Sequence, residues 1–213
     1  MSDVAAIVLA AGRGTRFGDE PKLLARLGGK TLVRHVVEAA VGSTVDPVIV
    51  VTGHRSEEVE ASLHELPVRV LHNASFAEGL STSLKAGFAA LPQQARAAVI
   101  LLGDMPFVKA DLIDALAAGW RDRGGPAALV PTLNGRRGNP VVLSRDLQVE
   151  IENLSGDVGA GPILRGRPDV VEWPTTDPAV AQDIDTKEEF SRAFSGEVDP
   201  VRRQKMRQTK EES

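Results

Sequence analysis

The stretch AAIVLAAGRGTRFGDEPK, residues 5–22, joins an apolar run to a loop that is rich in glycine and positive charge. The apolar run, residues 5–10, has no polar position, which is typical of a strand buried on both faces. The loop carries three glycines and three cationic residues: Gly12, Gly14, Gly18, Arg13, Arg16 and Lys22. Glycines let a backbone lie close to phosphates, and ligands bind beyond the carboxyl ends of strands in open α/β sheets. The stretch therefore indicates a phosphate-binding loop after the first strand.

Beyond this stretch, short apolar runs alternate with segments of helical period. We expect further strands at residues 47–53, 68–73, 97–104, 126–132 and 170–174, and helices at residues 30–42, 56–66, 81–91, 110–120 and 186–194. Residues 133–143 are expected to form a turn and a short antiparallel strand, because short connections join antiparallel neighbours. Ser56 is expected to cap the helix that it begins. The alternation predicts an α/β fold, a single-domain Rossmann-like three-layer sandwich with a mostly parallel sheet and a short antiparallel element.

Size and composition limit the class of protein. The 213 residues are 42% hydrophobic and 25% charged, which suits one α/β domain over residues 1–195 with a polar extension over residues 196–213. The net charge of -4 argues against general nucleic-acid binding, and the lack of cysteine excludes disulfides and cysteine-rich zinc sites. No apolar run approaches the ~20 residues of a membrane span. The first residues lack the positive charge of a signal peptide, so we expect a cytoplasmic protein without membrane or nucleic-acid partners.

Two kinds of phosphate-binding loop are compatible with the glycines. A redox dinucleotide loop runs straight into a helix, and an acid about 20 residues later binds the ribose. Here Pro21 and its charged neighbours interrupt the helical period, and the second strand ends in TGH without an acid. A nucleotidyl-transfer loop instead wraps a triphosphate and places cations on its oxygens. The cations of this loop could also be solvated surface residues without a role. Because they share one loop with the glycines, we favour a nucleotidyl-transfer loop.

The motifs resemble those of a known family. LAAGRGTRFGDEPKLL, residues 9–24, is similar to the signature LAAGxSxRMGxxKLL of the MobA-like nucleotidyltransferases. Further segments match in order: NASFAEGLSTSLKAG (73–87), LLGDMPFV (101–108), GRRGNPVVL (135–143), GDVGAG (156–161) and AQDIDTKEEF (181–190). The resemblance spans residues 4–194. LAAG together with DIDT is most similar to the molybdenum cofactor cytidylyltransferases, since guanylyl-transferring relatives usually carry LAGG.

The resemblance implies nucleotidyl transfer, in which an acceptor phosphate attacks the α-phosphorus of CTP and pyrophosphate leaves. It implies that Lys22 and Arg16 neutralise the triphosphate and that Asp104 and Asp185 hold Mg²⁺. The catalytic candidates are Lys22, Arg16 and Asp104. It further implies a set of nucleotide-binding residues, which are Leu9, Ala10, Ala11, Gly12, Arg13, Gly14, Lys22, Gly79 and Ser83.

Each metal-binding candidate has a structural alternative. Asp104 follows an apolar run and should stand at the carboxyl tip of a central strand, where it could instead cap a turn. Asp185 stands before the last expected helix and could cap it, with Thr186 as a rival cap. Asp183 of the same segment is the alternative ligand, and we favour Asp185.

The segments that face the acceptor depart from the family pattern. Asn139 stands in place of the histidine of the family's GHP, and Gly161 in place of the arginine of GDxGAR. With Asp157, they are the acceptor-binding candidates. Both losses make this side less cationic, which argues against a pterin phosphate as the acceptor. Another arginine could replace the missing charge: Arg136, Arg137 or Arg165.

Molybdopterin is the acceptor that the resemblance favours, and the product would serve a xanthine dehydrogenase-type enzyme. A second hypothesis is transfer to another small phosphate, such as a sugar, polyol or lactate phosphate, or transfer from GTP. A third is a non-catalytic maturation factor that holds the finished cofactor. The loop arguments disfavour a fourth, a nicotinamide oxidoreductase.

Overall fold

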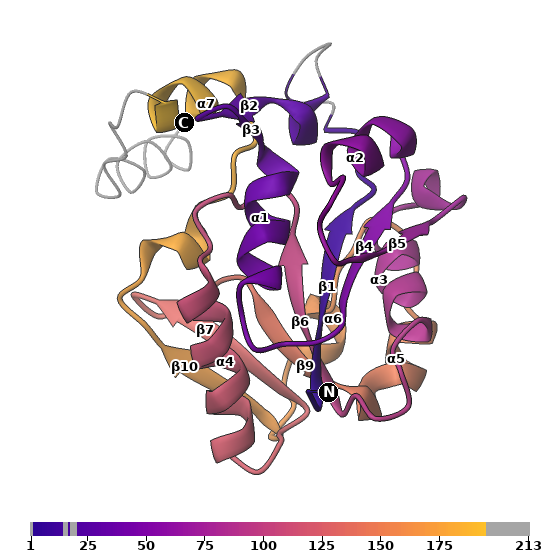
Figure 1. The fold of residues 1–213 in the computed structure, drawn as a ribbon. Coiled ribbons are helices and arrows are strands. Elements are labelled where there is room, and N and C mark those ends of the chain that lie inside the picture. The colour runs from indigo at the N-terminus through magenta and orange to yellow at the C-terminus, as the bar shows by residue number, and fades with distance from the viewer. Residues whose placement is uncertain (1, 15–16, 18–20, 195–213) are drawn as a thin grey trace, which may run out of the picture.

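The computed structural model describes residues 2–14, 17 and 21–194 (Figure 1). Its strands are β1 (Val4–Ala10), β2 (Arg26–Leu27), β3 (Lys30–Thr31), β4 (Val48–Thr52), β5 (Arg69–His72), β6 (Ala97–Leu102), β7 (Ala128–Leu133), β8 (Arg136–Arg137), β9 (Val141–Ser144) and β10 (Val170–Pro174). Its α-helices are α1 (Leu32–Val41), α2 (Ser56–Ser62), α3 (Leu80–Ala89), α4 (Ala110–Asp122), α5 (Gln148–Glu152), α6 (Gly161–Leu164) and α7 (Lys187–Phe194). The strands and longer helices expected from the sequence are confirmed.

The main sheet runs in the order β10-β7-β9-β6-β1-β4-β5, and β8 pairs with the carboxyl-terminal end of β7. Strands β6, β1, β4 and β5 are parallel to one another, and β10 is parallel to β7. Strand β9 lies antiparallel between β6 and β7, and β8 is antiparallel to β7. The short connections of residues 133–143 thus produce the antiparallel element that the sequence predicted.

Helices cover both faces of this sheet, which makes the three-layer sandwich (Figure 1). Helices α1, α2 and α4 bury their apolar residues on one face, and α3, α5 and α6 bury theirs on the other. In β1, Ala6 and Val8 face the first set of helices, whereas Ile7 and Leu9 face the second. Because successive strand residues point to opposite faces, burial on both sides requires the unbroken apolar run of β1.

One expectation about helix capping is wrong. Ser56 is the first residue of α2, and the cap position belongs to Arg55. Arg55 adopts a left-handed conformation, with φ 53°, and its carbonyl accepts hydrogen bonds from the backbone N–H groups of Glu58 and Val59. The turn after β4 is held to the first loop by the bond from His54 N–H to the Ala11 carbonyl (3.1 Å), and the helix begins one residue earlier than a cap at Ser56 would give.

Register brings the functional loops to one edge of the sheet. Ala10 pairs with Thr52 of β4, and Leu9 pairs with Leu102 of β6. The carboxyl ends of these parallel strands are therefore level, and the segments after them lie together at the upper end of the view in Figure 1. This is the edge at which open α/β sheets bind ligands.

The expected extension over residues 196–213 lies outside the described residues, so the domain boundary stays a prediction. Within residues 2–14, 17 and 21–194, no helix is both long enough and apolar enough to cross a membrane.

Candidate active site

The first loop packs closely around Lys22. Gly14 has φ 59°, and a Cβ atom added to it would lie 2.8 Å from the Cβ of Lys22. Only glycine fits this position without a shift, because it has no side chain and tolerates positive φ. The side chains of Leu9, Ala10 and Ala11 are buried, whereas Gly12 and Arg13 are exposed. Arg16, which was predicted to neutralise the triphosphate, lies outside the described residues.

Lys22 forms ion pairs with the two acids that were predicted to bind the metal. Its Nζ lies 2.5 Å from Asp104 Oδ2 and 3.0 Å from Asp185 Oδ1. The side chains of Lys22, Asp104 and Asp185 are 11%, 18% and 27% exposed. The structure thus gathers residues from the first loop, the tip of β6 and the start of α7 into one partly buried cluster, which we call the lysine–aspartate cluster.

The electrostatics of this cluster keep Lys22 protonated. Burial lowers the pKa of Lys22, but the charge of Asp104 and the hydrogen bonds to Asp104 and Asp185 raise it by more. The net pKa lies above the ordinary lysine value. A permanently charged ammonium at the mouth of a glycine-rich loop suits the binding of phosphate oxygens.

Thr186 takes a capping role at the start of α7. The Thr186 Oγ1 accepts a hydrogen bond from the backbone N–H of Glu189 (3.2 Å). In return, Glu189 Oε2 accepts a hydrogen bond from the backbone N–H of Asp185 (2.8 Å). This reciprocal pair resembles a capping box. The rival cap expected from the sequence is therefore formed by Thr186, and the Asp185 carboxylate reaches Lys22.

Asp104 has the donor atoms that a hard cation requires. Its Oδ1 is buried and has no hydrogen-bond partner among the described residues, so it does not cap a turn there. Carboxylate oxygens are the ligands that Mg²⁺ prefers, usually one or two from the protein together with phosphate oxygens of the substrate. The described residues contain no group of three or more metal-ligating side chains. Asp104 and Asp185 therefore fit a cation that is shared with a nucleotide, not a cage made of protein alone.

The predicted second nucleotide segment is packed against the GDVGAG segment. Gly79 precedes α3 with φ 116°, and an added Cβ would lie 2.4 Å from backbone atoms of Gly156. Asp157 Oδ1 accepts a hydrogen bond from the backbone N–H of Leu80 (3.2 Å), the first residue of α3. Asp157, an acceptor-binding candidate, thus supports the segment that carries Gly79.

Ser83 points into the protein. It is 3% exposed, and its Oγ accepts a hydrogen bond from Asn73 Nδ2 (3.0 Å). Asn73 Nδ2 also donates to Thr82 Oγ1 (2.8 Å), and Asn73 Oδ1 accepts from the backbone N–H of Ser75 (3.0 Å). These bonds tie α3 to the turn before it. A direct contact between Ser83 and a nucleotide stays a prediction.

Replacing Gly79 by alanine should destabilise the fold. The new methyl group would collide with Gly156 at a backbone position that disfavours side chains, so we expect a loss of about 1–3 kcal/mol in the free energy of unfolding. A thermal melt should show Tm falling by roughly 2–4 °C per kcal/mol. Gly161→Ala is the control, because nothing among the described residues lies within 4 Å of the position that its new methyl group would take. Equal Tm values for the two variants would contradict the packing described.

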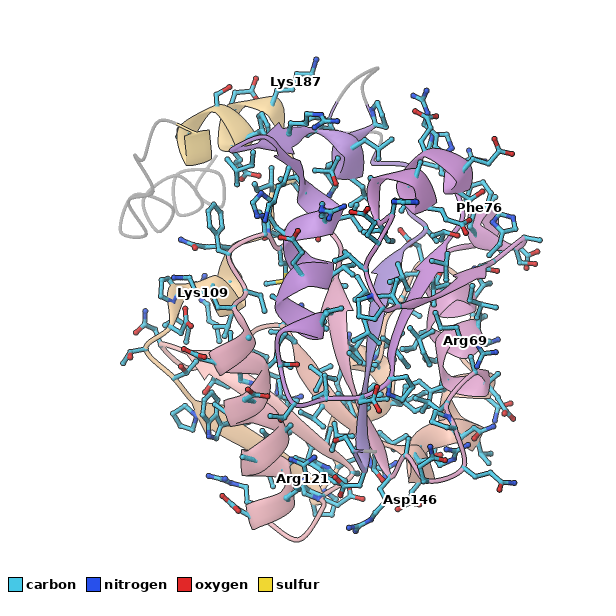
Figure 2. All side chains as sticks on the ribbon, viewed as in Figure 1. Arg69, Phe76, Lys109, Arg121, Asp146 and Lys187 are labelled. Carbon is cyan, nitrogen blue, oxygen red and sulfur yellow. The ribbon has the colours of Figure 1, made fainter. Side chains whose placement is uncertain are left out.

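A small pocket opens beside the lysine–aspartate cluster. It lies between the first loop, the turn that begins at Lys22 and the segment before α2, and its lining residues are Gly12, Arg13, Pro21, Lys22, Leu23, Leu24, His54, Arg55 and Val59. The Arg13 guanidinium lies 5.6 Å from the centre of the Phe76 ring, and the His54 ring lies 6.2 Å from it. Figure 2 shows Phe76 at the upper right of the molecule and Arg121 and Asp146 at its lower end. No pattern in the sequence assigned a role to His54, Arg55 or Phe76, although Phe76 lies in the matched segment 73–87.

The remaining acceptor-side candidates lie on separate elements. Asn139 donates its backbone N–H to the Val180 carbonyl (2.9 Å), and Gly161 is an exposed residue at the start of α6. Of the arginines that could replace the missing cations, Arg137 pairs with Glu172 (2.9 Å). Arg136 and Arg165 are exposed.

The match to a family settles the identity of the domain. The sequence pattern described as the MobA-like NTP transferase domain matches residues 6–171. The chain belongs to the MobA-like NTP transferase family. This confirms the resemblance seen in the motifs and establishes a nucleotidyltransferase domain.

Solved structures at 25% identity or more share this MobA-like fold. A homologue of Mycobacterium tuberculosis Rv0371c, from Mycobacterium sp. strain JC1, is 29% identical with a TM-score of 0.80, over 92% of this chain and 97% of that one. Rv0371c of M. tuberculosis, solved in complex with manganese, is 26% identical with a TM-score of 0.76, over 91% and 99% of the two chains.

Curated relatives of this MobA-like chain carry different names. Nicotine blue oxidoreductase of Paenarthrobacter nicotinovorans is 30% identical, over 89% of this chain and 95% of that protein. The bifunctional protein GlmU of Legionella pneumophila strain Lens is 34% identical over 71% of this chain, which is 32% of that longer protein.

Proposed function

We propose that this protein transfers CMP from CTP to a phosphate-bearing acceptor, with molybdopterin as the favoured acceptor, and releases pyrophosphate. The observation that carries the proposal is the lysine–aspartate cluster at the carboxyl edge of the sheet. Family membership supports nucleotidyl transfer, and LAAG with DIDT supports cytidylyl transfer to the pterin. The product would serve a xanthine dehydrogenase-type enzyme.

The chain's residues would act by positioning and by charge neutralisation, since the reaction needs no covalent intermediate. Lys22 and Arg16 bind triphosphate oxygens and stabilise the charge that develops as pyrophosphate leaves. The backbone of residues 9–14 holds base and ribose, and Gly79 and Ser83 complete the base pocket. Asp104 and Asp185 would hold Mg²⁺. When bound, that ion supplies Lewis-acid stabilisation of negative charge on the phosphates.

Arg13 is held near the pocket by Phe76, so Phe76 should influence nucleotide binding. A contact of this kind at an exposed site contributes about 0.5–1 kcal/mol. Phe76→Leu should therefore raise the KM for CTP by roughly 2–5-fold, with kcat little changed. Phe76→Tyr keeps the ring and should restore the KM. If Phe76→Leu leaves the KM unchanged, Arg13 does not depend on this ring for substrate binding.

The acceptor side is expected to bind a phosphorylated pterin weakly, because Asn139 and Gly161 replace a cationic pair of the family pattern. The double change Asn139→His with Gly161→Arg should tighten molybdopterin binding and leave CTP affinity unaltered. Isothermal titration of both ligands against both proteins measures this. Tight binding to the wild type that weakens in the double variant would contradict this assignment of the acceptor side.

A second candidate function is reduction of a small organic substrate by a nicotinamide cofactor. It is favoured by the 30% identity to a nicotine blue oxidoreductase over nearly the whole of both chains. The first loop argues against it, because Pro21 interrupts the α-helix that a redox dinucleotide loop needs, and a 3₁₀ helix of three residues, Lys22–Leu24, follows in its place.

One screen separates these functions. Pyrophosphate release is measured with each of four NTPs against molybdopterin and sugar, polyol and lactate phosphates, and NADPH consumption is followed in parallel. The proposal expects release with CTP and molybdopterin that requires a divalent metal. Release with GTP or another acceptor selects the alternative transferase. Ligand binding without turnover selects a maturation factor, and NADPH consumption without pyrophosphate release selects the reductase.

A further inference from the structure

The ammonium of Lys22 occupies the space between the two acids to which the proposed function assigns the metal. Its Nζ is within hydrogen-bond distance of both carboxylates, at 2.5 and 3.0 Å. The lysine side chain is 11% exposed, so solvent screens this interaction only partly. A cation is therefore already present at the carboxylate pair before any metal arrives.

The backbone of Lys22 is fixed. Its carbonyl accepts a hydrogen bond from the Ala25 N–H (3.1 Å), and its Cβ packs against Gly14 so closely that no larger residue fits there. The flexible four-carbon stem is then the part that can move. Because Lys22 also lines the pocket with Gly12 and Arg13, rotation of the stem would carry Nζ from the carboxylates toward the pocket.

We propose that Lys22 excludes a free divalent cation from Asp104 and Asp185 until a nucleoside triphosphate binds. The inference rests on the proposed function, which supplies the triphosphate. A divalent cation held by both acids would lie close to the ammonium, and like charges at such distances repel strongly in a partly buried site. The triphosphate offers the ammonium new oxygen partners on the pocket side. The carboxylates are then available to the cation, including the buried Asp104 Oδ1, which accepts no hydrogen bond from the described part of the chain.

The consequence is a reciprocal coupling between two ligands. If the nucleotide raises the affinity for the cation, the cation must raise the affinity for the nucleotide by the same factor. Couplings of this kind are typically about 5–150-fold. In this protein Lys22 should add to the coupling that comes from direct ligation of the cation by phosphate oxygens, because Lys22 contacts the acids and lines the pocket.

The test measures Mn²⁺ binding by electron paramagnetic resonance of the free ion, with and without a non-hydrolysable CTP analogue. Without the analogue, Lys22→Met should bind Mn²⁺ about tenfold more tightly than the wild type. The analogue should tighten Mn²⁺ binding in both proteins, because its phosphate oxygens are also ligands, and the tightening should be about tenfold larger in the wild type than in Lys22→Met. Lys30→Met is the matched control, because Lys30 pairs with Glu38 away from the cluster and should behave as the wild type.

Two further variants keep the outcome decisive. Lys22→Gln should reproduce Lys22→Met if the methionine variant folds poorly, and Asp185→Asn in the Lys22→Met background should abolish the gain in Mn²⁺ affinity. Equal Mn²⁺ affinities of wild type and Lys22 variants without the analogue would overturn the proposal. If no protein binds the analogue while the Lys22 variants still gain Mn²⁺ affinity, the proposed function fails and the exclusion by Lys22 stands.

Discussion

Replacing Asp104 by asparagine should lower kcat for nucleotidyl transfer by about 10³-fold and leave the fold intact. The neutral amide is a poor ligand for a hard cation, and metal stabilisation of phosphate charge contributes several kcal/mol, at about 1.4 kcal/mol for each factor of ten. Lys22 keeps Asp185 as a partner in this variant, so the cluster loses one of its two carboxylates only. Pyrophosphate release at sub-millimolar Mg²⁺ measures the effect, and a thermal melt measures the fold.

The two acids of the DIDT segment provide the matched control for this prediction. Asp185→Asn should lower the rate as Asp104→Asn does, because the Asp185 carboxylate shares the same ammonium. Asp183→Asn should keep a nearly normal rate. An unchanged rate in Asp104→Asn would remove Asp104 from the metal site, and a large fall in its Tm would indicate a structural role instead.

The second large effect is expected for Lys22→Ala, which should lower kcat by ~10²–10³-fold. Removal of the ammonium takes away a donor aimed at the charge that develops on the phosphates. The same variant should bind Mn²⁺ more tightly than the wild type, since the carboxylates lose their internal cation. A lower kcat together with a higher metal affinity would separate this role from general damage to the site.

Steady-state kinetics decides between catalysis and binding for Lys22. If only the KM for CTP rises while kcat is unchanged, Lys22 contributes equally to ground state and transition state, and its catalytic role is wrong. Lys30→Ala is the control, because Lys30 is an exposed partner of Glu38. It should change neither constant.

The fold could be predicted because its signals are local and strong. The unbroken apolar runs of β1 and β6 and the helical periods between strands predict a covered parallel sheet directly. Elements of a few residues could not be predicted. The two-residue strands β2 and β3 and the short helices α5 and α6 contain too few residues to show a hydrophobic period. Arg55 at the cap of α2 was missed because a left-handed backbone conformation is uncommon for arginine and no local pattern indicated it.

The candidate site could be predicted as a set of residues but not as an arrangement. Motif resemblance selected Lys22, Asp104 and Asp185, yet Lys22 is 82 and 163 residues away from the two acids in sequence. Direct contact between them depends on strand order and register, which no local pattern encodes. The stacking of Arg13 on Phe76 was missed for the same reason, since an aromatic residue in a turn carries no periodic signal.

The position of bond cleavage tests the central claim most directly. CTP labelled at the α-phosphorus is incubated with the protein, a divalent metal and molybdopterin, and the products are separated. Nucleotidyl transfer predicts that the α-label moves into the pterin product, that label from γ-labelled CTP appears in pyrophosphate, and that Asp104→Asn loses both. Recovery of all α-label in unreacted CTP or free CMP with every phosphate acceptor tested, alongside NADPH consumption by the same protein, would contradict the account.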